Sequence, residues 1–322
     1  MNYRALGSTG LVVSELGYGC WGIGGISEGA TSYGETDDVV SRDALRRAYD
    51  RGITLFDTAD VYGSGRSEEI LGEALKQVRP QVVLASKVGM VRYGDPADFS
   101  PAHIMQAIEG TLRRLQTTWL DLYQLHSPDM ALLLEQPESM LALRRLKEQG
   151  KIRAFGISVR EPQDAVAAIE QLGCECVQVN FNLIDQRPLQ NGLLQLCERQ
   201  RIALIARTPL CFGFLSGRYS AESVFDERDH RSRWPREQIA LWASAHNRFR
   251  AVVETRSPQT SAQLALRYCI SYPEVSTTIP GMLTPQEVEE NAVVSDLGPL
   301  AASERLAIEG IYRRSNFFVA SS

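Results

Sequence analysis

Short apolar runs rich in Val, Ile and Leu recur along the chain and alternate with longer amphipathic stretches. A short apolar run bounded by turn residues is typical of a buried strand, whereas apolar positions three and four apart are typical of a helix. The alternation indicates repeated strand and helix units with parallel strands, rather than a series of hairpins. Eight strands are predicted, at residues 16–19, 53–58, 82–87, 121–126, 152–158, 176–181, 202–207 and 275–280.

Amphipathic segments between these strands predict helices, and several begin with Ser or Pro and end at Gly, which are ordinary start and stop signals. The predicted helices cover residues 41–51, 67–77, 101–115, 139–149, 162–171, 188–200 and 258–270. Eight strands with intervening helices can close into a (β/α)8 barrel, here expected as a single domain over residues 1–322. An open doubly wound sheet is the alternative that the same pattern allows.

Two segments fall outside the repeat. Residues 1–13 carry GSTG between alternating apolar positions, which predicts a β-hairpin that plugs or caps the barrel. Residues 210–257 follow the seventh strand and contain DERDHRSRWPRE, then a helical run through Trp242 and Phe249. A connection this long in a compact domain is usually a lid or a binding loop, so we expect it near the site.

Charge and composition exclude several classes of partner. The net charge is −5 and the pI is about 5.6, which provides no basic field for nucleic acid or anionic lipid. No apolar run has the length of a signal peptide core or of a membrane span. We therefore expect a cytoplasmic protein with a small-molecule substrate and with neither a nucleic-acid nor a membrane partner; its oligomeric state is left open.

The six cysteines and four histidines show no metal-site pattern. The cysteines form no C-x-x-C pair, and none lies at zinc-ligand spacing from a histidine. We interpret them as reduced and mostly buried, and we predict no metal site.

Polar residues stand at the ends of three consecutive predicted strands, where a barrel carries its active site. Asp57 ends ITLF, Lys87 ends VVLAS and His126 ends DLYQL, while Tyr62 follows Asp57 by five residues. Each has a structural explanation when taken alone: an Asp57–Lys87 salt bridge, a packed imidazole and a packed loop aromatic. Together, on neighbouring strands, they favour a catalytic site.

These four side chains suit proton transfer to a carbonyl oxygen. Tyrosine is a weak acid with an ordinary pKa of about 10. An ammonium about 4 Å away would favour the phenolate by up to roughly 4 kcal/mol at an effective dielectric near 20. We therefore expect Lys87 to lower the pKa of Tyr62 and Asp57 to keep Lys87 charged. His126 is expected to donate a hydrogen bond to the carbonyl oxygen as negative charge develops there.

The segment FDTADVYGSGRSEEILGEAL resembles the signature of the aldo-keto reductase superfamily, and the chain as a whole is similar to its bacterial members. ASKVG, YQLHSPD, KIRAFGIS and TIPGMLTPQEVEEN resemble later family motifs in the same order. The resemblance implies a (β/α)8 fold and hydride transfer between a nicotinamide cofactor and a small carbonyl or alcohol. It also implies Tyr62 as general acid, Lys87 and Asp57 as its modulators, and His126 as the group that orients the carbonyl.

The same resemblance assigns cofactor contacts. Asp57 lies beside the cofactor, Ser158 and Gln178 hold its carboxamide, and Arg207 takes the place of a stacking tyrosine. Val159 replaces the asparagine that is usual next to that serine. The pyrophosphate loop corresponds to Pro209, Leu210, Gly213, Leu215, Gly217 and Arg218. The adenosine end corresponds to Ile279, Gly281, Met282, Gln286, Glu290 and Asn291.

Substrate contacts are expected from Trp21, Tyr62 and His126, and from residues 21–34, 90–99, 127–130 and 210–257. Sugars, sugar nucleotides, small aldehydes and natural-product ketones all fit this mixture of aromatic and polar groups. The G-x-G-x-x-G match at residues 17–22 does not run into an apolar helix, so it is not interpreted as a dinucleotide fingerprint.

The family default for the cofactor is NADPH, and NADH is the alternative. Residues 279–291 contain no basic residue but three glutamates, Glu287, Glu289 and Glu290. A carboxylate near the ribose repels a 2'-phosphate, so we predict weaker discrimination for NADPH than is usual in the family. Basic residues at positions 228, 231 and 233 of the long loop are the candidates that would restore it.

Two other functions compete with the reductase. One is a cofactor-binding regulatory or redox-sensing subunit with little turnover, like the potassium-channel β subunits of the same superfamily. The other is a metal-dependent barrel hydrolase, which needs His and carboxylate clusters at strand ends. Only one of the four histidines stands at such an end, which disfavours the hydrolase.

Overall fold

The computed structural model describes residues 1–27, 31–90, 92–253 and 259–319. Eight parallel strands neighbour one another in chain order. They are β3 (Tyr18–Gly19), β4 (Leu55–Asp57), β5 (Val83–Val88), β6 (Leu120–His126), β7 (Ile152–Ser158), β8 (Cys176–Asn180), β9 (Ala203–Arg207) and β10 (Thr277–Ile279). Parallel bridges from Leu16 to Thr278 and from Gly19 to Gly281 join the two edges of this sheet. The (β/α)8 barrel is confirmed, and the open-sheet alternative is wrong.

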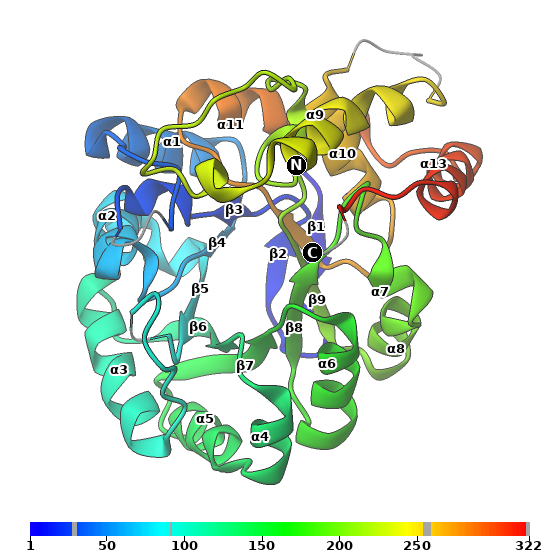
Figure 1. Cartoon of the computed structure of the whole chain (residues 1–322). Helices are drawn as coiled ribbons and strands as arrows, with labels where there is room; N and C mark the ends of the chain where they lie inside the picture. The colour runs from blue at the N-terminus through cyan, green and yellow to red at the C-terminus, as the bar shows by residue number, and fades with distance from the viewer. Residues whose placement is uncertain (28–30, 91, 254–258, 320–322) are drawn as a thin grey trace.

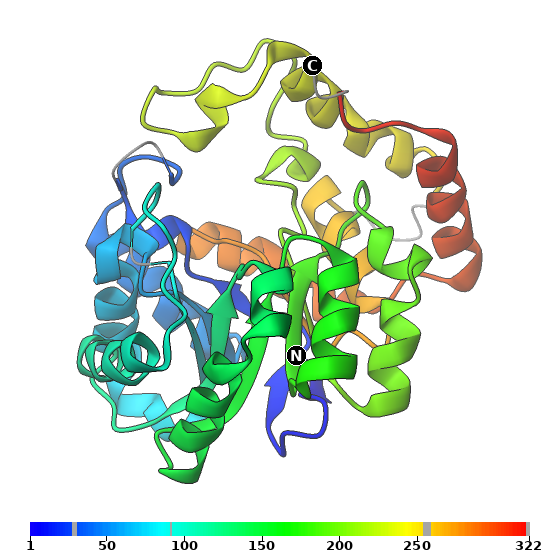
Figure 2. The same cartoon turned by 60° about the horizontal axis from the view of Figure 1, so that its bottom comes forward.

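Most of the helices surround the strands as an outer ring, whereas α9 belongs to a segment that covers one end of the barrel (Figure 1 and Figure 2). They are α1 (Asp38–Asp50), α2 (Arg66–Leu75), α3 (Pro101–Arg114), α4 (Met130–Glu135), α5 (Glu138–Glu148), α6 (Pro162–Ala167), α7 (Arg187–Gln190), α8 (Leu193–Gln200), α9 (Arg236–Arg250), α10 (Ser261–Ile270), α11 (Pro285–Ala292), α12 (Val294–Leu297) and α13 (Ala302–Arg314). The ring buries the outward-facing apolar side chains of the strands against the inward faces of the helices.

Local chemistry explains where the helices differ from their predicted ranges. Helix α1 begins three residues earlier than expected because Asp37 caps it, accepting from the backbone amides of Val39 and Val40. The helix predicted at 188–200 is broken into α7 and α8 because Gly192 adopts a φ of +79°. The helix predicted at 162–171 ends as α6 and continues as a π-helical turn, Ala168–Leu172.

The N-terminal hairpin plugs one end of the barrel, as predicted. Strands β1 (Tyr3–Ala5) and β2 (Val12–Ser14) pair antiparallel, and apolar side chains of this segment join the cluster inside the barrel. Gly7 has a φ of +56°, and a Cβ there would lie 2.4 Å from the backbone nitrogen of Ala203. Only glycine therefore fits this close approach of the turn to β9.

The long segment after β9 arches over the opposite end of the barrel (Figure 2). It contains two 3-10 turns, Phe214–Ser216 and His230–Arg233, and then α9. The His230 amide donates to the Ser32 carbonyl at 2.8 Å, so the segment touches the loop between β3 and α1. The predicted end of this segment at 257 and the predicted start of the next helix at Pro258 lie outside the described residues; α10 begins at Ser261 behind a Thr260 cap.

All six cysteines are buried and free, as predicted. In the described part of the chain, no helix combines the length and the apolar character that a bilayer span requires. The prediction of one domain over the whole chain stays a prediction.

Candidate active site

The barrel brings Asp57, Lys87 and Tyr62 into direct contact. Strands β4 and β5 are paired neighbours, which places the Asp57 and Lys87 side chains at the same end of the barrel. The Lys87 ammonium donates to Asp57 Oδ1 at 2.5 Å, to the Thr58 carbonyl at 2.9 Å and to the Tyr62 hydroxyl at 3.2 Å. Lys87 and Asp57 are both buried, so each charge depends on the other to offset its desolvation.

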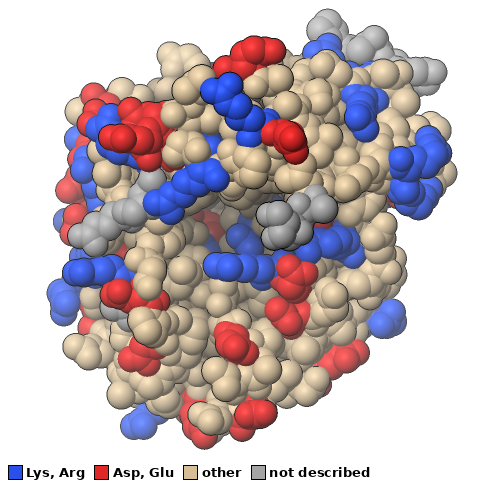
Figure 3. Space-filling model, in the orientation of Figure 1, with Lys and Arg blue, Asp and Glu red and all other residues tan. Residues whose placement is uncertain are grey.

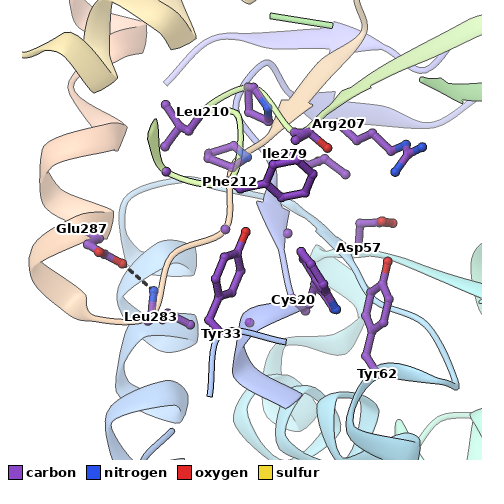
Figure 4. A pocket seen from close by; sticks show the side chains of 18 of the residues that line it. Cys20, Tyr33, Asp57, Tyr62, Arg207, Leu210, Phe212, Ile279, Leu283 and Glu287 are labelled. Atoms are coloured by element: carbon purple, nitrogen blue, oxygen red, sulfur yellow. Dashed lines mark hydrogen bonds between the residues drawn. The ribbon is translucent and has the colours of Figure 1, made fainter. Parts of the chain in front are cut away.

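A glycine next to Tyr62 sets the position of its ring. Gly63 adopts a φ of +59°, and a Cβ there would lie 2.2 Å from the carbonyl oxygen of Gly24. The backbones of Gly63 and Gly24 therefore approach each other closely, and the loop after β4 packs against the loop after β3. The Tyr62 ring then points its hydroxyl into the pocket near Asp57 (Figure 4). Its centroid lies 5.7 Å from that of His126 in an edge-to-face arrangement.

The expected lowering of the Tyr62 pKa is wrong. Burial raises the pKa of Tyr62 well above its ordinary value, and the negative charge of Asp57 raises it further. Burial also lowers the pKa of Lys87, against the effect of Asp57. Desolvation therefore outweighs the attraction that was considered from the sequence. The consequence is that Tyr62 remains protonated at neutral pH, which is the state that a proton donor needs.

His126, the last residue of β6, is a neutral imidazole. Burial lowers the pKa of His126 well below its ordinary value, and the charges of Lys87, Arg207 and Arg160 lower it further. Its Nδ1 is buried without a partner among the described residues. An unpaired acceptor costs less than an unpaired N–H, so the proton is favoured on Nε2. A neutral Nε2–H is suited to donate to a carbonyl oxygen.

These two protonation states predict a flat pH profile. Tyr62 stays protonated below pH 10 because its pKa is raised, and His126 stays neutral above pH 6.5 because its pKa is lowered. We expect kcat for reduction of a neutral aldehyde to change by no more than about two-fold between pH 6 and pH 8. A titration near pH 6.5 that disappears in His126→Gln would contradict the neutral imidazole.

A cavity of about 420 Å³ opens beside these residues and extends away from them. Asp57, Tyr62, His126 and Trp21 line it, and Lys87 lies behind them. Among the other expected cofactor contacts, the cavity is lined by Gln178, Arg207, Pro209, Leu210, Gly213, Arg218, Ile279, Gly281, Glu290 and Asn291. Its walls do not include Ser158, Leu215, Gly217, Met282 and Gln286.

The residues expected to hold the carboxamide are engaged with each other. Gln178 Nε2 donates to both oxygens of Asp57 at 3.1 Å, and Ser158 Oγ lies 3.3 Å from Gln178 Oε1. The Arg207 guanidinium donates to the Val159 carbonyl at 3.0 Å, while its Nε is buried without a partner among the described residues. The Gln178 amide and the Arg207 guanidinium line the cavity, with the Ser158 hydroxyl behind Gln178, and these polar groups fit the planar carboxamide of a nicotinamide.

The loop after β9 has the backbone shape of an anion-binding segment. Thr208, Cys211 and Phe212 adopt positive φ although they are not glycine, and Gly213 and Gly217 do so as well. Residues that alternate between right-handed and left-handed backbone can turn successive N–H groups towards an anion. In this loop the amides of Cys211, Gly213 and Phe214 donate to carbonyls of the loop itself. The loop lines the cavity at the place where the resemblance puts the pyrophosphate of a dinucleotide.

Acidic side chains lie at the end of the cavity that is farthest from Tyr62 and Asp57. Arg218 forms ion pairs with Glu287 and with Glu290, and Glu287 also accepts from the Leu283 amide at 2.7 Å. Glu287 and Leu283 lie across the pocket from Tyr62 and Asp57 (Figure 4). Arg231, one of the proposed phosphate clamps, is occupied by Asp229, by the Tyr219 hydroxyl and by the Phe212 carbonyl.

Aromatic rings from distant segments wall the cavity above the catalytic group. Trp21 lies 5.0 Å from Tyr33 and 4.8 Å from His230, and Phe212 lies 5.1 Å from His230. Sequence reasoning named the loops that supply these rings but, apart from Trp21, not the residues. Their side chains become neighbours only when the segment after β9 folds over the barrel. Tyr93, also in the cavity wall, belongs to the predicted 90–99 loop.

Comparison with known proteins shows the family to which the chain belongs. A model of the aldo/keto reductase family matches residues 15–313. Aldo-keto reductase YhdN of Bacillus subtilis is 33% identical over 298 residues, covering 90% of this chain and 87% of that protein. The NADH-specific methylglyoxal reductase of Escherichia coli is 28% identical over 315 residues, covering 91% and 93%. A probable voltage-gated potassium channel subunit beta of Oryza sativa is 29% identical over 321 residues, covering 94% of each.

Solved structures agree with the fold. The holo form of aldo-keto reductase AKR11C1 from Bacillus halodurans has a TM-score of 0.80 at 29% identity, covering 98% of each chain. Glycerol dehydrogenase AKR11B4 from Gluconobacter oxydans has a TM-score of 0.81 at 28% identity, covering 99% of this chain and 97% of that one. The chain belongs to the aldo/keto reductase family. It is an oxidoreductase that uses a nicotinamide cofactor and acts on carbonyl and alcohol groups of small molecules.

Proposed function

We propose that Tyr62, Lys87, Asp57 and His126 form the catalytic group of this reductase. The observation that carries the proposal is the Lys87 ammonium, which touches both Asp57 and the Tyr62 hydroxyl at the cavity wall. When bound, the nicotinamide cofactor supplies a hydride to the carbonyl carbon or accepts one from the alcohol. The residues proposed to hold it are Gln178, Ser158 and Arg207 at the nicotinamide and the 209–218 loop at the phosphates.

In the reducing direction, the carbonyl oxygen lies between Tyr62 and His126. His126 donates a hydrogen bond to this oxygen through Nε2, which stabilises the negative charge that develops as the carbonyl is reduced. Tyr62 then transfers its hydroxyl proton to the oxygen. The developing phenolate is stabilised by Lys87, whose own charge is offset by Asp57. In the oxidising direction the same proton returns to Tyr62.

The direct test is turnover. Protein is mixed with NADPH or NADH and a panel of aldehydes, and nicotinamide absorbance is followed. Aldehyde-dependent loss of the reduced cofactor is the expected result. A regulatory subunit is the second candidate, because the probable potassium channel subunit beta is similar in sequence to this chain over 94% of its own length. Tight cofactor binding without turnover across the panel would favour that candidate.

We infer that this reductase discriminates less strongly for NADPH over NADH than is usual in the family. Glu287 and Glu290 are positioned at the far end of the cavity, and the ion pairs of Arg218 with both of them leave it poorly available for a 2'-phosphate. We expect kcat/KM for NADPH to exceed that for NADH by less than about 100-fold, a difference of roughly 2.7 kcal/mol. A larger ratio would show that a phosphate clamp exists.

Two glutamate variants make this comparison sharper. Glu290→Gln should raise the ratio of kcat/KM for NADPH to that for NADH, because it removes a negative charge and frees part of Arg218. Glu289→Gln is the matched control, since Glu289 pairs instead with Arg47 and Arg51 on α1 and its C-cap. If both variants changed the ratio of kcat/KM for NADPH to that for NADH equally, Glu290 would have no specific role in the choice of cofactor.

We also infer a cytoplasmic protein whose partner is its small-molecule substrate, with neither nucleic acid nor a membrane involved. The net charge of −5 supports this inference. Distribution of the protein between cytosolic and membrane fractions after cell lysis tests it.

A further inference from the structure

Most charged side chains in the cavity wall have an opposite charge as partner. Arg218 is paired with two glutamates, Arg231 with Asp229, and Asp57 with Lys87. Among the described residues that line the cavity, Arg160 and Arg207 are the basic residues without a carboxylate within salt-bridge distance. The cavity wall therefore carries two arginines that have no ion-pair partner among the described residues.

Both of these arginines lie at the catalytic end. Arg207 ends β9, and Figure 4 shows it on the same side of the pocket as Asp57 and Tyr62. Arg160 lies two residues after Ser158, the residue that pairs with His126 between β6 and β7. The positive charges of Arg160 and Arg207 both lower the pKa of the His126 imidazole.

No described carboxylate forms an ion pair with either arginine, although the charges of Asp57 and Asp185 act on Arg207 from a greater distance. Glu161 follows Arg160 directly but forms its ion pair with Arg187, which Asp185 also holds. Arg207 is held by the neutral carbonyl of Val159. Two like charges close together are unfavourable unless an anion joins them. Basic side chains also border the hollow on the face drawn in Figure 3.

The cofactor does not supply the missing anion at this end. Its phosphates are assigned to the 209–218 loop, towards Arg218 and the far end of the cavity. Its nicotinamide ring is neutral when reduced and positive when oxidised. A negatively charged group beside His126 must therefore belong to the carbonyl substrate and not to the cofactor.

We propose that the physiological substrate carries an acidic group, a carboxylate or a phosphate, a few bonds from its reacting carbonyl, and that Arg160 binds this group with Arg207 beside it. The proposal rests on the reductase function proposed above and narrows its substrate class. A guanidinium binds a carboxylate or a phosphate through paired N–H donors. The two arginines therefore select a negatively charged substrate, and either anion can occupy the same site.

The test compares acidic and neutral aldehydes of similar size. The pairs are 4-oxobutanoate with butanal, and glyceraldehyde 3-phosphate with glyceraldehyde. Wild-type kcat/KM should be at least about 10-fold higher for the acidic member of one pair, which also tells carboxylate from phosphate. Arg160→Gln should remove this preference while leaving kcat/KM for the neutral aldehyde within about two-fold. Arg199→Gln, on the outer helix α8, is the matched control and should behave as wild type.

A second measurement does not need an acidic substrate. Acetate and inorganic phosphate are tested as inhibitors of butanal reduction at saturating cofactor. One of them should compete with butanal, and its inhibition constant should rise at least about 10-fold in Arg160→Gln. Equal kcat/KM for both members of each pair, or a preference that survives Arg160→Gln, overturns the inference while the reductase function stands. Failure to reduce any aldehyde instead removes the proposed function.

Discussion

Tyr62→Phe is expected to lower kcat for carbonyl reduction by at least about 100-fold. The substitution removes the hydroxyl that Lys87 contacts at 3.2 Å and keeps the ring that packs edge-to-face on His126. No other hydroxyl is in contact with the Lys87 ammonium among the described residues, so no second donor replaces it. Steady-state kinetics with a neutral aldehyde measure the effect.

Cofactor binding provides the control for this variant. Fluorescence titration with NADPH and with NADH should give unchanged dissociation constants, since the phenol of Tyr62 is not among the proposed cofactor contacts. Tyr33→Phe is the matched substitution: Tyr33 also lines the cavity, but it packs on Trp21 and His230 and not on Lys87. If Tyr62→Phe kept a kcat close to that of wild type, the assignment of the proton donor would be wrong.

Lys87→Met is expected to reduce turnover at least as much as Tyr62→Phe without unfolding the protein. Methionine fills most of the same buried volume, but it removes the charge that stabilises the Tyr62 phenolate during proton transfer. It also leaves Asp57 buried without its cation. Asp57 still accepts two hydrogen bonds from Gln178, which limits the loss of stability. Kinetics and thermal unfolding of the same preparation test both parts.

A structural salt bridge would give the opposite pattern. If Lys87 and Asp57 only stabilised the fold, Lys87→Met would lower the melting temperature strongly, and the folded fraction would retain normal kcat. The double variant Lys87→Met with Asp57→Asn removes the uncompensated carboxylate. It should recover stability relative to Lys87→Met alone and should not recover kcat.

Element type and order could be predicted from the sequence because they depend on local periodicity. All eight strands lie where short apolar runs predicted them, since strands buried on both faces must be apolar throughout. The hairpin plug was predictable from its turn and its alternating residues. Helix ends were less accurate, because a single cap such as Asp37 or a single break such as Gly192 decides them.

By itself, the sequence determined the barrel and the end of it that carries the active site. A charged residue at the end of an apolar strand, such as Lys87, must either have an oppositely charged partner or take part in the function. Only the tertiary structure decided how the charges balance. The pKa of Tyr62 is raised because burial, which local sequence does not reveal, and the charge of Asp57 outweigh the opposing charge of Arg207. The pairing of Arg218 with Glu287 and the unpaired state of Arg160 likewise depend on distances between strand ends and loops far apart in the chain. Electrostatic energy follows separation in space and exposure to water, and both are set when the barrel closes.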